Sequence, residues 1–260
     1  MTAKVVSVIN LKGGVGKSTI AMILGEYLAF RKNKRVLLLD LDSQCNLTYA
    51  MMKNDHFTHL RNSYKTVYHI FKNALDGRIR PVNNCICDQH LWVSNIARGP
   101  IQPTLDMVVA APDLAQLDVE MLALWESGQP APNRFNETLK KSLVNILDHY
   151  DIVLIDCPPS LSLFTSCAIM ASDFFVAPII PEPLSILGLD LVISRIRELK
   201  RRYPEIRIEF KGSILNKVRA DRKTHRRVAE QIYGNDANIY MPFKSWIPDA
   251  ERLRVIGDFE

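Results

Sequence analysis

Short apolar runs alternate with longer stretches of helical periodicity through most of this 260-residue chain. The runs are apolar at consecutive positions rather than at every second one, which predicts strands buried on both faces of a sheet. They lie at 5–9, 35–40, 105–112, 151–156, 174–180 and 208–215. Strands that alternate with helices are typical of a doubly wound, mostly parallel sheet with helices on both faces. The pattern therefore predicts an α/β fold.

Between these runs, apolar residues recur at the three- and four-residue spacing of amphipathic helices. The helices expected from this spacing cover 20–30, 66–75, 113–125 and 136–149, and a basic helix follows near 195–202. Asp113 is placed to cap the third of them, and Pro130 and Pro132 mark a loop at 129–133. Residues 45–104 give few signals beyond the helix at 66–75.

Composition favours one large domain over residues 1–260, because 47% hydrophobic residues can fill a core and no linker is visible. Five cysteines, an odd number spread along the chain, do not suggest a disulfide framework and fit a reducing compartment. No apolar run is long enough for a membrane span, and the first strand leaves no room for a signal segment. We therefore expect a soluble, cytoplasmic protein.

The segment between the first strand and the first helix predicts a phosphate-binding loop, because the motif requires that context. Its glycines let the backbone approach phosphates and turn N–H groups and a helix N-terminus towards negative charge. Lys17 is expected to contact the β- and γ-phosphates, and the Ser18 hydroxyl to bind Mg²⁺. The predicted nucleotide-binding residues of this loop are Lys12, Gly13, Gly14, Val15, Gly16, Lys17, Ser18 and Thr19.

Three carboxylates follow predicted strands, at the strand ends where ligand sites lie in open α/β sheets. Asp40 and Asp42 are two residues apart, so an extended segment places both on one face. Asp156 ends the apolar run 152–155 and is placed to hold Mg²⁺ through water. Together with the phosphate-binding loop, these acids predict a Mg²⁺-dependent enzyme of phosphoryl transfer.

Lys12 makes this loop unusual, because the standard pattern has glycine five residues before Gly16, where this chain has Leu11. A second lysine directly before the glycine pair is the signature lysine of a deviant Walker A loop. In this feature the chain resembles the ParA/MinD family of dimeric P-loop ATPases. The run Asp40-Leu41-Asp42-Ser43-Gln44 resembles the family's Asp-x-Asp-Pro-Gln, with serine in place of proline, and the run at 181–189 resembles the ParA branch.

This resemblance implies ATP and Mg²⁺ as cofactors and a homodimer that forms on ATP binding. Lys12 would contact the partner's nucleotide, Lys17 would stabilise the phosphates, and Asp42 would position and polarise the attacking water. Asp40 would support the Mg²⁺ shell formed by Ser18 and Asp156.

The resemblance also places the nucleobase near the C-terminal strand. Asn216 ends the run at 208–215 and would read the adenine ring, as asparagine does at this place in the family. Pro248 would close the same pocket. Both assignments depend on the resemblance, because many strands end in asparagine and many loops contain proline.

The net charge of +5 and the pI near 8.9 make an acidic partner plausible, and the positive residues cluster. Two neighbouring stretches are basic, and in the ParA branch such an arrangement binds duplex DNA through its phosphates without sequence preference. The candidate DNA-binding residues are Arg197, Lys200, Arg201, Arg219, Arg222, Lys223 and Arg226. The first three share a helix face by spacing. The alternative is a solvated basic surface.

A metal site is suggested weakly by histidines and cysteines in the middle of the chain. Their irregular spacing does not match a structural zinc site, so we expect none. The residues concerned are His56, His59, His69, Cys85, Cys87 and His90. The iron–sulfur carrier branch of the family is also disfavoured, since its cysteine pair lies nearer the C-terminus.

The sequence thus predicts a ParA-like positioning ATPase. The ATP dimer would bind non-specific DNA, and slow hydrolysis, stimulated by a ParB-type adaptor, would release it. The alternative is a MinD-like ATPase on a membrane surface or protein scaffold, against which the segment 251–260 counts because it is short and ends in acids. A third class, a metabolic ligase or kinase, would need a pocket for an acceptor substrate, and no stretch of the sequence indicates such a pocket.

Overall fold

The computed structural model describes residues 2–87, 91, 104–126, 135–219, 221–234 and 237–250. Its centre is a six-stranded sheet with the order β3-β2-β4-β1-β5-β6, and all paired strands of this sheet run parallel. The strands are β1 (Lys4–Val8), β2 (Val36–Asp40), β3 (Leu105–Val108), β4 (Ile152–Asp156), β5 (Phe174–Ile179) and β6 (Glu209–Leu215). The predicted parallel α/β fold is confirmed. The predicted loop at 129–133, the segment 251–260 and His90 lie outside the described residues.

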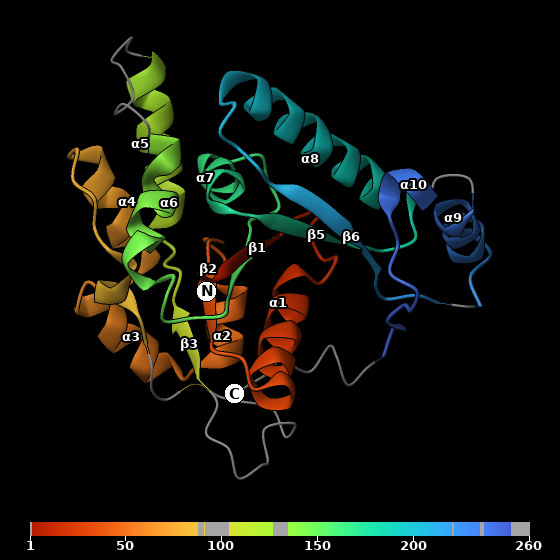
Figure 1. The fold of residues 1–260 in the computed structure, drawn as a ribbon, viewed down its shortest axis with the longest axis horizontal. Helices are drawn as coiled ribbons and strands as arrows, with labels where there is room; N and C mark the ends of the chain where they lie inside the picture. The colour runs from red at the N-terminus through yellow and green to blue at the C-terminus, as the bar shows by residue number, and fades with distance from the viewer. Residues whose placement is uncertain are drawn as a thin grey trace.

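Helices cover both faces of the sheet (Figure 1). On one face lie α1 (Lys17–Glu26), which continues in a π-helical turn (Tyr27–Arg31), and α2 (Asn46–Met51). On the other lie α7 (Leu163–Ala171) and α8 (Pro183–Arg202). Every residue of β2 is consequently buried, as parallel strands require. Each leucine buried there contributes about 1.5–3 kcal/mol.

The remaining helices lie beside and beyond the sheet. They are α3 (Asn54–Asn62), α4 (Val67–Leu75), α5 (Leu114–Glu126), α6 (Thr138–Leu143), α9 (Lys223–Tyr233) and α10 (Ala237–Tyr240), with 3₁₀ turns at Val82–Cys85, Phe135–Glu137 and Val144–Ile146. The helices α2, α3 and α7 are absent from the sequence-based prediction. For α7 the reason is that nearly all of its residues are buried, which leaves no polar stripe to show a helical period.

Two predicted elements are shorter than expected. The helix expected over 136–149 is a short α-helix between two 3₁₀ turns, because the Leu147 carbonyl accepts a hydrogen bond from the Ala3 N–H instead of continuing a helix. The strand expected over 105–112 ends at Val108. Beyond it, the Val109 carbonyl accepts from the Val67 N–H, and the Ala110 N–H donates to the Thr48 hydroxyl. The backbone groups of Val109 and Ala110 therefore bond to Val67 and Thr48 and not to a neighbouring strand of the sheet.

The sheet register gathers the predicted acidic residues at one edge. Asp156 pairs with Val8 of β1 on one side and with Asp40 of β2 on the other. The phosphate-binding loop leaves β1 at this edge, so the carboxyl ends of three strands meet beside it. Within the described residues, no helix combines the length and apolarity that a bilayer span requires.

Candidate nucleotide-binding and hydrolysis site

The loop between β1 and α1 has the conformation that its glycines predict. Gly14 and Gly16 have φ angles of 73° and 91°, a region that residues with a Cβ rarely adopt. A Cβ on Gly16 would also lie 2.3 Å from Nδ2 of Asn216. Helix α1 begins at Lys17, directly after Gly16, so its first N–H groups face the space above the loop.

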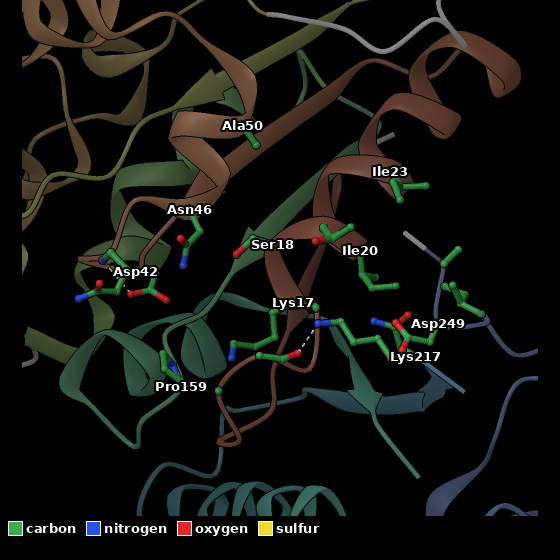
Figure 2. Close-up of a pocket in the computed structure, with 18 of the residues that line it drawn as sticks. Lys17, Ser18, Ile20, Ile23, Asp42, Asn46, Ala50, Pro159, Lys217 and Asp249 are labelled. Atoms are coloured by element: carbon green, nitrogen blue, oxygen red, sulfur yellow. Dashed lines mark hydrogen bonds between the residues drawn. The ribbon is translucent and has the colours of Figure 1, made fainter. Parts of the chain in front are cut away.

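A cleft of about 470 Å³ lies over this loop, which is within the usual range for small-molecule sites. Figure 2 shows Asp42 and Pro159 on one side, Lys217 and Asp249 on the other, and Lys17 with Ser18 between them. The structure thus brings together most of the predicted nucleotide-binding residues. The residues of the prediction that line the cleft are Gly13, Gly14, Gly16, Lys17, Ser18, Thr19, Asp42, Asn216 and Pro248.

Lys17 and Asp156 form the buried charged centre of the cleft. Lys17 is only 7% exposed, and this burial lowers the pKa of its ammonium group. The negative charges of Asp156 and Asp42 act in the other direction but do not outweigh the burial. Burial raises the pKa of Asp156 well above its usual value, and the charge of Asp40 adds to this shift. Both Asp156 carboxylate oxygens are buried and make no well-aligned hydrogen bond among the described residues, and the neighbouring Ser18 hydroxyl and Lys17 ammonium only partly oppose the rise of the Asp156 pKa. A buried carboxylate that is not fully compensated is costly, so this group fits a divalent cation such as Mg²⁺, which binds oxygen ligands.

Asp40 and Asp42 have different environments. Asp40 is fully buried and accepts hydrogen bonds from the Asp42 N–H at 3.0 Å and from the Thr48 N–H and hydroxyl at 2.9 and 2.8 Å. Burial raises the pKa of Asp40 to about 7. Asp42 lines the cleft, and one of its oxygens accepts from the Gln44 N–H. Asp40, which was expected to support the metal shell, also holds the turn that carries Asp42 and leads into α2.

The predicted nucleobase contacts lie at the opposite end of the cleft. Asn216 is buried and its amide nitrogen donates to the Val15 carbonyl at 2.8 Å, so its visible role is to fix the loop. Pro248 lies in the wall formed with Ile247 and Asp249. The sequence analysis missed Lys217, whose ammonium donates to the Gly14 carbonyl at 2.9 Å. Its only sequence signal was its position directly after Asn216.

Lys12 lies outside the cleft that the neighbouring glycines form. Its ammonium group makes an ion pair with Glu182, the residue at the N-cap of α8. Its backbone N–H donates to Oδ1 of Asn10, whose amide nitrogen donates to the Pro178 and Ser185 carbonyls. Asn10 and Glu182 are further residues that the sequence analysis did not assign to the site, and the contacts that reveal them join residues far apart in the chain.

The basic residues form two clusters rather than one. His225 of α9 faces Glu182 at the beginning of α8, whereas Arg197 and Arg201 lie near the end of α8, about 25 Å further along that helix. Figure 1 shows α9 beside the N-terminal end of α8 and far from its C-terminal end. The exposed members are Arg197 and Arg201 in the α8 cluster, and Arg222, Lys223 and Arg226 in the α9 cluster.

Two of the candidate DNA-binding residues are engaged within the protein. The Lys200 ammonium donates to the Ile208 carbonyl at 2.7 Å. The Arg219 guanidinium makes an ion pair with Asp249, in the wall of the cleft. The structure thus places Arg219 beside the cleft over the phosphate-binding loop, paired with Asp249, whereas the members of the two clusters named above as exposed are open to solvent.

The histidines and cysteines of the middle region do not form a metal site within the described residues, where no group of three or more potential ligands is found. Cys87 forms an isolated antiparallel bridge with Met107 of β3, and its sulfur is 3.4 Å from Nε2 of His56. Both Cys85 and Cys87 are buried. Burial raises the pKa of the Cys85 thiol, which favours its uncharged form.

Comparison with known proteins identifies relatives over most of the chain. A family model described as an AAA domain matches residues 3–210. The sporulation initiation inhibitor protein Soj of Bacillus subtilis (strain 168) is 29% identical over 252 residues, which are 96% of this chain and 86% of that relative. A ParA family protein of Chlamydia pneumoniae is 30% identical over 203 residues, covering 77% of this chain and 68% of the relative.

A solved structure also shares the fold. A putative plasmid partition protein of Borrelia burgdorferi, bound to AMPPNP, has a TM-score of 0.73 at 23% identity, and the match covers 100% of this chain and 92% of that one. The family match includes the phosphate-binding loop and the carboxyl ends of β1, β2 and β4. These agreements in sequence and fold show that the chain belongs to the ParA branch of the ParA/MinD family of P-loop partition and positioning ATPases.

Proposed function

We propose that residues 1–260 act as one ATPase domain that dimerises on binding ATP, binds non-specific DNA as the ATP-bound dimer and leaves DNA after hydrolysis. The position of Lys12 carries this proposal. Lys12 belongs to the phosphate-binding loop but does not line the cleft of its own subunit. A role for Lys12 at the phosphates is therefore best supplied by a second subunit, as the signature lysine of the family implies.

ATP and Mg²⁺ are the proposed nucleotide and metal. The loop N–H groups and Lys17 bind the phosphates, and Ser18 with Asp156 holds the metal, which neutralises charge on the phosphate oxygens. The buried oxygens of Asp156, which make no well-aligned hydrogen bond among the described residues and have the Ser18 hydroxyl beside them, support this assignment. Ile20 and Ile23 of α1 lie on the side of the cleft where Asp249 lies (Figure 2), and they line the cleft together with Ile247 and Pro248; these apolar side chains suit a flat nucleobase.

Asp42 is the proposed water-positioning residue. It lines the cleft beside Pro159 and is held by the turn that Asp40 organises. Among the described carboxylates at the ends of β2 and β4, Asp42 is the one that lines the cleft, since Asp40 is engaged in hydrogen bonds and Asp156 suits the metal. Hydrolysis by Asp42 alone is expected to be slow, and a ParB-type adaptor is the proposed stimulating partner.

The proposed DNA surface comprises the exposed residues of the α9 and α8 clusters. Arginine and lysine bind phosphates irrespective of base sequence, and this binding weakens as salt concentration rises. DNA binding is measured from low to high salt with ATP, with ADP and without nucleotide. We expect tight binding only with ATP and a steep fall with salt. Equal binding in all three nucleotide states, or binding insensitive to salt, contradicts the DNA proposal.

The role of Lys12 has its own test. Lys12→Ala is expected to retain binding of a fluorescent ATP analogue to the monomer while losing the ATP-dependent dimer in sedimentation. A normal ATP dimer of this variant contradicts the cross-subunit role. Co-sedimentation with liposomes in ATP tests the MinD-like alternative, and a lipid-bound fraction without DNA binding favours it.

A further inference from the structure

Lys12 is docked within its own subunit in this structure. Its ammonium group pairs with one oxygen of Glu182, and the side chains of the two residues are 23% and 35% exposed. This contact lowers the pKa of Glu182, with a smaller contribution from His225. If Lys12 acts on the partner's nucleotide, as the proposed function requires, it must first leave Glu182.

The backbone beneath this contact is fixed. Helix α8 approaches the loop so closely at Gly188 that a Cβ there would lie 2.4 Å from Oδ1 of Asn10 and 3.2 Å from the Lys12 nitrogen. Asn10 in turn bonds to the Ser185 carbonyl in the first turn of α8. The beginning of α8 and the backbone of Lys12 therefore form one unit, in which the Lys12 side chain is the part that can change partners.

The other oxygen of Glu182 faces α9. His225 is 3% exposed, and its Nδ1 accepts a hydrogen bond from the Arg219 N–H at 3.1 Å. The proton of the neutral ring is therefore on Nε2. Nε2 is buried and lies 3.6 Å from Oε1 of Glu182, a long contact that already contributes to the lowered pKa of Glu182. This separation is longer than an ordinary hydrogen bond, so a small shift of Glu182 towards His225 would strengthen the contact.

We propose that Glu182 is a positioning residue that holds Lys12 within its own subunit before the dimer closes, and that the long contact with His225 tightens into the main partner of Glu182 when Lys12 leaves. The exchange moves the carboxylate to within about 3 Å of Nε2, a normal hydrogen-bond distance. Lys223 and Arg226 flank His225 on α9, and Arg222 is the N-cap of this helix. The strength of the contact between the beginning of α8 and this basic helix thereby depends on where Lys12 is bound.

The first experiment measures the docking of Lys12 without requiring a dimer. Lysines of the nucleotide-free protein are acylated in competition and quantified by mass spectrometry. Lys12 is expected to react about two- to fivefold faster in Glu182→Gln than in the wild type, the range for a partly exposed ion pair. Glu198→Gln is the matched control, because it removes a carboxylate paired with Arg195 on the same helix. Equal rates in the wild type and Glu182→Gln would overturn the docking.

The second experiment measures the consequence. In sedimentation, Glu182→Gln is expected to dimerise at an ATP concentration about two- to fivefold lower than the wild type, because the competing site is removed. His225→Gln is expected to keep the ATP dimer but to lose most of the ratio between its DNA affinities in ATP and ADP. The exchange is contradicted if Glu182→Gln needs the same or a higher ATP concentration than the wild type to dimerise. It is also contradicted if His225→Gln keeps the wild-type ratio between its DNA affinities in ATP and in ADP.

The two proposals fail in different ways. If the wild type neither dimerises nor binds DNA in ATP, the proposed function is wrong, whereas the acylation rates still decide whether Glu182 holds Lys12. If the wild type dimerises and Glu182→Gln behaves like Glu198→Gln in both experiments, only the exchange is wrong.

Discussion

At the scale of single residues, the phosphate-binding loop depends on Gly16 for two separate reasons. Its φ of 91° disfavours any residue with a Cβ, and the added atom would meet Asn216 at 2.3 Å. Gly16→Ala is therefore expected to lower stability by about 1–3 kcal/mol and to abolish binding of a fluorescent ATP analogue. Gly13→Ala is the matched control, since a Cβ there meets no atom within 4 Å. Equal melting temperatures for the two variants would contradict this account of the loop.

Substitutions of the two neighbouring residues Asp40 and Asp42 are expected to have different effects, one on the stability of the fold and the other on ATP turnover. Asp42→Ala should keep the melting temperature while ATP turnover falls at least about a hundredfold, because water loses its positioning group. Asp40→Ala should lower the melting temperature, since it leaves the Thr48 hydroxyl and two N–H groups without their acceptor. Thermal unfolding and phosphate release on both variants measure this. Normal ATP turnover in Asp42→Ala would show that another residue positions the attacking water.

At the scale of elements, Arg61 of α3 binds both oxygens of Asp113, at 2.9 Å each, and joins α3 to the beginning of α5. The sequence predicted Asp113 as a helix cap, and the structure turns its carboxylate towards Arg61. This contact lowers the pKa of Asp113 below its usual value. The folded protein therefore binds fewer protons at this site than the unfolded chain, and the stabilisation is lost as pH falls through the lowered pKa.

Arg61→Ala is accordingly expected to lower the free energy of unfolding by about 0.5–1 kcal/mol at pH 7, because the pair is partly exposed. The difference should shrink as the pH falls below the usual aspartate pKa of about 3.9 and vanish once the pH lies below the lowered pKa of Asp113. Urea unfolding in a series from neutral to acid pH measures it. Arg78→Ala, which removes an exposed arginine 3.7 Å from Asp76, is the control and should have little effect. A difference that persists in acid would show that packing rather than charge is involved.

At the scale of the whole molecule, the proposed DNA surface comprises two separate basic clusters, and we expect phosphate contacts at both. Arg226→Ala and Arg201→Ala should each reduce the slope of log affinity against log salt by about 0.9, the value for one lost phosphate contact. Lys65→Ala, at an exposed position of the loop before α4, should leave the slope unchanged. Titrations of ATP-bound protein at several salt concentrations test this. An unchanged slope in both arginine variants would exclude these helices from the DNA surface.

The glycine-rich loop, the alternating strands and helices and the carboxylates at strand ends were predictable from the sequence, because local spacing and backbone geometry determine them. Lys12 was visible as a position in a motif. Its partner was not, because Glu182 is distant in the chain and meets Lys12 only where α8 packs against the loop at Gly188. The same holds for Asn216 and Lys217, whose hydrogen bonds to the loop need the sheet to be formed.

The tertiary structure also distinguished residues that looked equivalent in sequence. Asp40 ends β2 and Asp42 follows two residues later, but only folding encloses Asp40 with Thr48 and leaves Asp42 at the cleft. The basic residues lie in two stretches that are neighbours along the chain, yet the length of α8 separates them in space. Sequence by itself determined the family, the fold and the phosphate-binding chemistry. Contacts between distant segments decided which side chains are open to a ligand and which are held, because burial and partners exist only once the chain is folded.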